Sequence, residues 1–230
     1  MTSAALDFSS PLLAPLQVFN LLPSRTLHAE RARAFWPEDA EHAPLLQHES
    51  VERALHRQRS AELLQSLGEH AQPVDDLAHA ELPLALAAPP LLAQLARLSG
   101  VMLMGGMLRR TIARDHVAHA KQVLGAEIFH WAQGDAEALH PGLDDAQLRP
   151  WLGEDLHASA VALGSGLVAN AWHEAPAPIR LRANWKLPAQ AETQELRAAS
   201  GLAPHAARDV CLALMQQLDS TWLSSFPATR

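Results

Sequence analysis

Apolar side chains recur at helical spacing along most of this sequence. Between residues 23 and 35 they fall on one face of a helix that Pro37 stops, and Ser24 is placed to cap its start. A second helix is expected over residues 50–67, because its apolar residues share one face and Gly68 follows where helices often end. These two segments predict a helical N-terminal third.

A longer helical pattern fills the centre and the C-terminal end. The four prolines between residues 71 and 90 predict a connection, because proline cannot donate a helical hydrogen bond. The chain beyond them is strongly apolar, and Gly105 and Gly106 predict either a break or the close approach of another backbone. Gly164 and Gly166 predict tight helix packing. Further helices are expected over residues 114–123, 126–133, 155–172 and 204–223.

The period changes once, between residues 179 and 187. Apolar residues alternate there with polar ones, and prolines bound the segment on both sides. This alternation predicts a β-strand that presents Arg180, Arg182 and Lys186 to solvent, opposite an apolar face turned to the core.

The elements together predict a mainly α fold with one minor strand. A length of 230 residues with 48% hydrophobic side chains is enough to bury one substantial core. Residues 1–15 are rich in serine, alanine and proline without a clear period, which indicates a poorly ordered start. We therefore expect one compact helical domain over residues 16–230.

Charge and cysteine content narrow the class of protein. The formal net charge of -7 argues against a large basic surface for nucleic acid or anionic lipid. Cys211 is the only cysteine, so no internal disulfide can form and a reducing compartment is expected. The start of the chain lacks the pattern of a secretory signal. The apolar segment 82–93 is too short and proline-rich to span a membrane. We expect a cytoplasmic protein whose membrane association is indirect.

Histidine is the most suggestive residue type for chemistry. Thirteen histidines are present, and His116 and His119 lie one helical turn apart beside Asp115. No HExxH motif and no cysteine pair accompany them, and Cys211 falls on an apolar stripe that favours packing over reactivity. Phosphate-binding glycine motifs are absent from the sequence. The sequence thus predicts no enzyme, no metal and no cofactor.

Two groups of basic residues are the candidates for partner binding. Arg109 and Arg110 either bind an acidic surface or form a solvated helix end near a favourable dipole. The basic residues Arg180, Arg182 and Lys186 of the expected strand either protect a sheet edge or contact an acidic partner.

Three stretches resemble a known family. They are Phe19 to Pro37, reading FNLLPSRTLHAERARAFWP, Leu95 to Arg110, reading LARLSGVMLMGGMLRR, and Ser165 to Pro188, reading SGLVANAWHEAPAPIRLRANWKLP. In order and spacing the chain is similar to the YscK/SctK accessory proteins of the type III secretion sorting platform. It departs most from them in the His- and Ala-rich segments 70–90 and 133–160.

The resemblance implies a non-enzymatic adaptor needed for protein export. Such an adaptor links the inner-membrane ring protein SctD to the cytoplasmic pod protein SctQ, beneath which SctL and the ATPase SctN lie. It would be held at the cytoplasmic face of the inner membrane by protein contacts. Two alternatives stay open: a small metal-dependent hydrolase using His116, His119 and Asp115, and a secretion chaperone that grips an extended segment of its substrate.

Overall fold

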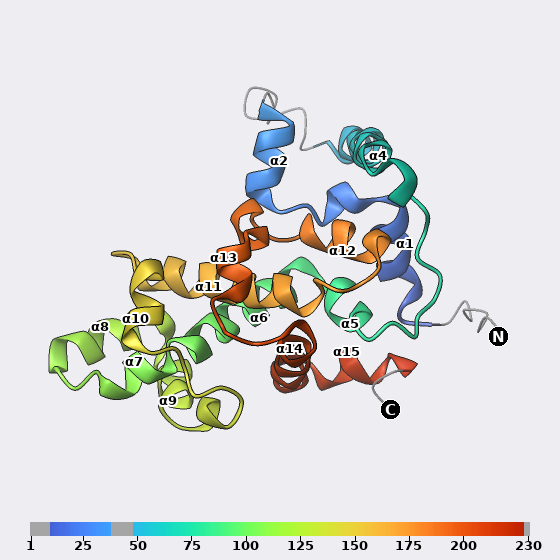
Figure 1. Cartoon of the computed structure of the whole chain (residues 1–230). Coiled ribbons are helices and arrows are strands. Elements are labelled where there is room, and N and C mark those ends of the chain that lie inside the picture. Colours follow the sequence, from blue (N-terminus) through green and yellow to red (C-terminus); the bar gives the residue numbers. More distant parts are fainter. Residues whose placement is uncertain (1–9, 38–47, 228–230) are drawn as a thin grey trace. The chain divides into compact units, whose positions relative to one another are not determined.

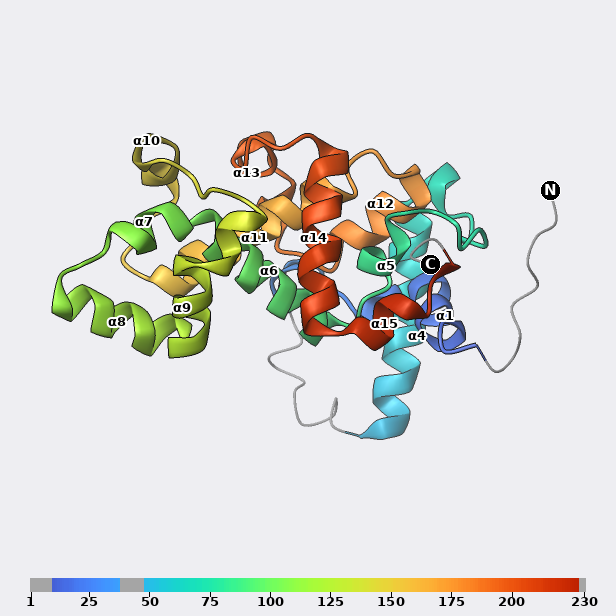
Figure 2. The ribbon, with the colours of Figure 1, turned by 90° about the horizontal axis from the view of Figure 1, so that it is seen from below.

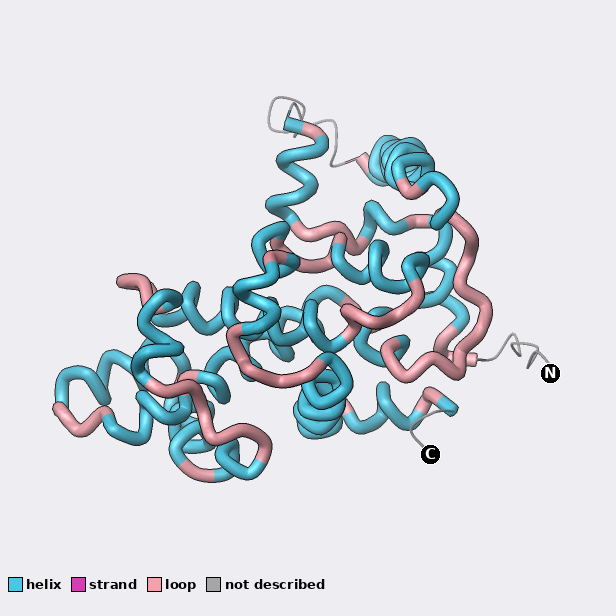
Figure 3. The backbone as a smooth tube through the Cα atoms, viewed as in Figure 1, coloured by secondary structure: helices cyan, strands magenta, loops and turns pink. Residues whose placement is uncertain are grey.

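A computed structural model describes residues 10–37 and 48–227 of the chain, and this part is mainly α-helical (Figure 1). Helices and loops alternate along the described residues without a β-strand (Figure 3). The expectation of a mainly α fold is confirmed. Within the same residues, no helix combines the length and the apolar character needed to cross a membrane.

The chain folds into two compact units and passes between them several times. The first unit comprises residues 1–89, 174–189 and 221–230, and the second comprises residues 90–173 and 190–220. One domain over residues 16–230 remains a prediction. The poorly ordered start expected over residues 1–15 is wrong for its last residues, because α1 begins at Leu13 and Leu12 is buried. Residues 1–9 lie outside the described part of the chain.

The first unit brings N-terminal helices together with a later segment. Its α-helices are α1 (Leu13–Leu21), α2 (Ala29–Phe35), α4 (Glu49–Ser66), α5 (Leu82–Ala85), α12 (Ala177–Asn184) and most of α15 (Ser220–Ser224). Helix α12, orange in Figure 1, packs on α5. Beyond its end, the carbonyl of Trp185 accepts the N–H of His28 at 2.8 Å. The carbonyl of Leu187 accepts Nε of Arg31 at 2.7 Å.

The expected helix over residues 23–35 is divided in two. A 3₁₀ turn covers Pro23–Arg25, and α2 then starts after His28, whose side chain accepts the N–H of Glu30. Ser24 is therefore not a helix cap. It is buried, and its hydroxyl and N–H are used to hold the turn against α4.

The second unit is built around α11 (Leu156–Ala171), which packs against α14 (Pro204–Leu218) and α13 (Gln194–Ala198). Figure 2 shows α14 crossing α11. Asp155 caps α11 by accepting the N–H groups of His157 and Ala158, as its position predicts. The remaining helices are α6 (Pro89–Leu103), α7 (Gly105–Arg110), α8 (Arg114–Leu124), α9 (Ala126–Gln133) and α10 (Asp145–Leu148).

Glycines set the distance between helices in this second unit. A methyl group on Gly164 would overlap the backbone of Ala96 in α6, and one on Gly166 would meet the carbonyl of Leu196 in α13. Tight packing at both glycines is thus confirmed. Gly106 lies against the backbone of Gly142, whose φ is +85°, so the break and the close approach expected there both occur.

The predicted strand over residues 179–187 is wrong, because most of it forms α12. Pro178 fits the first helical turn, where no N–H is needed. The buried side chains of this helix, Ile179, Arg182 and Ala183, follow helical spacing, and Lys186 continues the same row. Arg182 and Lys186 are charged but buried, although charged side chains are usually exposed. The alternation of apolar and charged residues therefore does not correspond to an alternation of buried and exposed ones.

Candidate functional site

A groove on the second unit is the clearest candidate site. Helices α6, α9 and α14 enclose about 370 Å³ of open space. Its apolar lining consists of Leu98, Ile128, Trp131 and Leu218, and each of these side chains remains partly exposed. Gln94, Arg97 and Gln217 add polar groups. A concave apolar surface with few polar groups is typical of a site that binds another molecule.

Of the described residues that line this groove, Arg97 is the only charged one. Its Nη2 donates to the carbonyl of Leu124, the last residue of α8, where a basic group also suits the helix dipole. Its Nε is buried without an acceptor, and no carboxylate of the described residues lies within ion-pair distance of the guanidinium. The groove thus contains a cation whose hydrogen-bonding capacity is only partly used.

Arg109 and Arg110 lie together at the end of α7. Arg109 donates to the carbonyl of Pro141 and lies 3.7 Å from a carboxylate oxygen of Glu137. Arg110 pairs with Asp145 at the start of α10. Both arginines therefore hold the segment after α9 against α7, and about half of the Arg110 side chain is still exposed. Contact of Arg109 and Arg110 with a partner stays a prediction.

Close to these arginines, Ile112 is 89% exposed in the short connection between α7 and α8. An aliphatic side chain in this position gains nothing from folding, because its apolar area stays in water. A single exposed apolar residue is common on proteins. Ile112 nevertheless lies between two basic residues, Arg110 and Arg114. This connection is therefore a second surface for which binding of a partner can be tested.

The three basic residues of the expected strand have different positions. Arg180 is half-buried, whereas Arg182 is 1% and Lys186 is 6% exposed. The expectation that Arg182 and Lys186 face solvent is wrong, because both side chains turn inward and end on backbone carbonyls. Arg182 donates to the carbonyls of His70 and Ala71, at 3.3 and 2.7 Å. In this conformation these two residues stabilise the first unit and offer no surface to a partner.

Lys186 is the most unusual ionisable group of the first unit. Its Nζ donates to the carbonyl oxygens of Ala85 and Ala87, at 2.7 and 2.6 Å, and lies 5.8 Å from the centre of the Phe19 ring. Burial lowers the pKa of this ammonium group to about 7. The carbonyl bonds supply part of the solvation that the ammonium loses on leaving water.

The histidines expected as metal ligands are on the surface. His116, His119 and Asp115 are all exposed on α8. Across residues 10–37 and 48–227, no three His, Cys, Asp or Glu side chains are close enough to hold a metal ion together. The spacing of His116 and His119 thus gives two neighbouring histidines without a third ligand.

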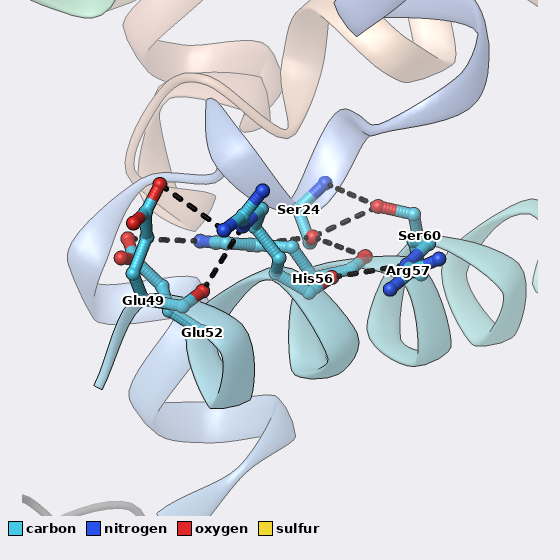
Figure 4. Close-up of polar contacts among 7 residues, drawn as sticks. Ser24, Glu49, Glu52, His56, Arg57 and Ser60 are labelled. Atoms are coloured by element: carbon cyan, nitrogen blue, oxygen red, sulfur yellow. Dashed lines mark hydrogen bonds and ion pairs between the residues drawn. The ribbon is translucent and has the colours of Figure 1, made fainter. Parts of the chain in front are cut away.

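A Ser–His–Glu cluster in the first unit resembles a catalytic triad at first sight (Figure 4). Ser24 Oγ lies 2.9 Å from Nδ1 of His56, and Nε2 of His56 lies 3.8 Å from Glu52. Ser24 is buried, however, and its hydroxyl also bonds the His56 carbonyl and the hydroxyl of Ser60. A nucleophile must reach its substrate. We therefore interpret the cluster as a structural contact between the 3₁₀ turn and α4.

The sequence does not predict the groove. Its lining comes from three helices, and no local sequence pattern indicates how these helices pack against one another. The one sequence signal is that Ile128 and Trp131 are apolar at i, i+3 spacing on a short helix, beside its buried residues Phe129 and Ala132. Comparison of the chain with models of known protein families, with curated proteins and with solved structures finds no match.

Proposed function

We propose that this protein is a non-enzymatic adaptor of the cytoplasmic sorting platform of a bacterial type III secretion system. It links an inner-membrane ring protein of the SctD kind to a pod protein of the SctQ kind, and through the latter to SctL and the ATPase SctN. Protein contacts hold it at the cytoplasmic face of the inner membrane, and export requires it.

The groove of α6, α9 and α14 is the observation that carries the protein-binding part of the proposal. Four partly exposed apolar side chains meet there around about 370 Å³ of space. Exposed apolar surface that is gathered in one hollow gains free energy when a partner covers it, at roughly 25 cal/mol for each Å². Glutamine side chains at its edge can bond a partner's backbone.

The secretion part of the proposal rests on the resemblance of three stretches to the YscK/SctK family. Phe19 to Pro37 spans the end of α1 to just beyond α2, Leu95 to Arg110 spans most of α6 and all of α7, and Ser165 to Pro188 spans the end of α11 and all of α12. The second of these stretches contributes Arg97 and Leu98 to the groove. It also contains Arg109 and Arg110, which remain the basic candidates for a contact with an acidic partner.

Co-purification of the tagged protein from its own bacterium, after light crosslinking, tests the proposal. Mass spectrometry should recover the pod protein and the inner-membrane ring protein. Deleting the gene should stop export of all substrates of the secretion system. Recovery of neither protein would contradict the proposal.

The same experiment separates the two alternatives. Loss of one exported protein while the others are still exported would favour a secretion chaperone. Stoichiometric metal in the purified protein, found by elemental analysis together with neither partner, would favour the hydrolase at His116, His119 and Asp115.

A further inference from the structure

The groove of α6, α9 and α14 combines an apolar lining with one incompletely bonded cation. We propose that its occupant is an amphipathic helix of a partner protein, which inserts apolar side chains between the three helices and presents a carboxylate to Arg97. This inference deepens the proposed adaptor function, on which it rests, by stating the chemistry of the partner segment.

The helices that line the groove favour a helical partner segment over an extended one. An extended peptide is usually bound by adding a strand to a sheet edge, and the described residues contain no strand that could serve as a template. A helix instead places apolar residues at i, i+3, i+4 and i+7 on one face, which can cover the four apolar side chains that line the groove. Trp131 and Ile128 form one wall and Leu98 and Leu218 the others.

The charge of the groove favours an acidic residue on that helix. Among the described residues that line the groove, Arg97 is the only charged one, and no carboxylate of the described residues pairs with its guanidinium. Among the described residues, its guanidinium donates to the carbonyl of Leu124 through Nη2, so further N–H donors of the two Nη groups remain for a carboxylate. Covering Arg97 with an apolar or basic segment would remove its water without replacing it, which is unfavourable. An acidic helix avoids this cost.

Site-specific photocrosslinking in the native bacterium identifies the occupant. p-Benzoylphenylalanine in place of Trp131 puts a photoreactive aromatic side chain in the groove where an aromatic side chain already lies. The same probe in place of Gln216 is the control, because Gln216 is exposed on α14 and does not line the groove. We expect a crosslink from position 131 and not from position 216. The crosslinked peptide should be a helix-forming segment with apolar i, i+3 or i+4 spacing and at least one Asp or Glu.

A synthetic peptide with the crosslinked sequence then tests the role of each part of the groove. Arg97→Met keeps most of the apolar stem but removes the charge, and it should weaken binding about tenfold, because a hydrogen bond to a charged group is lost. Ile128→Glu should weaken binding at least as much, because it puts a carboxylate in the apolar lining. Gln216→Glu adds the same charge outside the groove and should leave affinity unchanged. Circular dichroism and thermal unfolding establish that each variant folds.

Several outcomes would overturn the inference. They are a crosslink to a second copy of this chain, a small molecule retained in native mass spectrometry, a crosslinked segment that is extended or basic, and no crosslink at position 131. The last result, with the pod and ring proteins still co-purifying, would reject the groove and leave the adaptor function standing. A crosslink to an acidic helix of an unrelated protein would support the inference about the groove and contradict the adaptor function.

Discussion

The ammonium nitrogen of Lys186 lies 2.7 Å from the carbonyl oxygen of Ala85, inside the core of the first unit. This contact joins residues that are 101 positions apart, and it makes a lysine part of the apolar core. A lysine in this position couples the stability of the unit to pH.

Stability should rise with pH between about 7 and 9. Burial lowers the pKa of Lys186 to about 7, whereas the unfolded chain keeps a value of 10.5. Over this interval the unfolded state binds more protons, so the free energy of unfolding increases as pH increases. The gain between pH 7 and 9 is about 2 kcal/mol at most. Burial raises the pKa of Cys211 to about 12 and so opposes the trend above its ordinary value of 9.0.

Urea unfolding at several pH values measures this dependence. Lys186→Met, which substitutes an unbranched, uncharged side chain one atom shorter, should abolish the slope between pH 7 and 9. Lys121 is the other lysine of the sequence and is half-buried, so Lys121→Met is the matched control and should retain the slope. An unchanged slope in Lys186→Met would show that another group is responsible.

Acid should weaken the second unit through His140. Its Nδ1 accepts the N–H of Gly142 at 3.0 Å, so Nε2 carries the proton and donates to the carbonyl of Ser200 at 3.2 Å. Burial lowers the pKa of His140 below 6.5, although the bond to Ser200 opposes the shift. Its contribution is complete above pH 6.5 and is lost as pH falls toward the lowered pKa, because the unfolded state then takes up the proton first.

Replacement of His140 tests this arrangement. His140→Leu should lower the free energy of unfolding at pH 7 by about 1–3 kcal/mol, because the partly buried N–H of Gly142 and the buried carbonyl of Ser200 lose their partner. It should also reduce the loss of stability between pH 7 and 5, as followed by chemical denaturation. His205→Leu, at an exposed position of the same unit, is the control. Equal losses in both variants would contradict the role of His140.

Gly164→Ala should destabilise the protein by about 1–3 kcal/mol, which is typical of overpacking. The added methyl group would overlap the backbone of Ala96, and backbone cannot move aside as a flexible side chain can. Gly153→Ala is the control within the same unit, because its methyl group would only reach ordinary contact with Ser159 Oγ at 3.8 Å. Urea unfolding of both variants compares the two sites. Similar stabilities would mean that α6 and α11 are not closely packed at Gly164.

Ile112→Glu should leave the free energy of unfolding within about 0.5 kcal/mol of the wild type, because the side chain it replaces is 89% exposed. If the connection between α7 and α8 contacts a partner, the same variant should reduce recovery of that partner. Thermal unfolding and quantitative co-purification measure the two effects. Loss of stability in this variant would show that Ile112 supports the fold.

Helices were predictable where their pattern was local. Asp155 as a cap and Gly164 at a close contact follow from residue type and position alone. Segment 179–187 was not predictable in this way, because Arg182 and Lys186 are buried on carbonyls contributed by residues about a hundred positions earlier. The sequence around a charged residue does not indicate that distant backbone carbonyls will accept its hydrogen bonds.

The candidate site depended even more on tertiary structure. Arg109 and Arg110 were singled out as a basic pair, and the structure adds their contacts with the segment after α9. No sequence pattern distinguishes Arg97, because a lone arginine in an apolar helix has many possible roles. Its significance comes from Ile128 and Leu218, which other helices bring to the same groove.

Reconstitution with purified partners tests the central claim most directly. The protein is mixed with the pod protein and with the cytoplasmic domain of the inner-membrane ring protein from the same bacterium, and the masses of the complexes are measured by light scattering after size exclusion. We predict a ternary complex that forms only when this protein is present. Failure to bind either partner, or a pod–ring complex that forms equally well without it, would contradict the adaptor function.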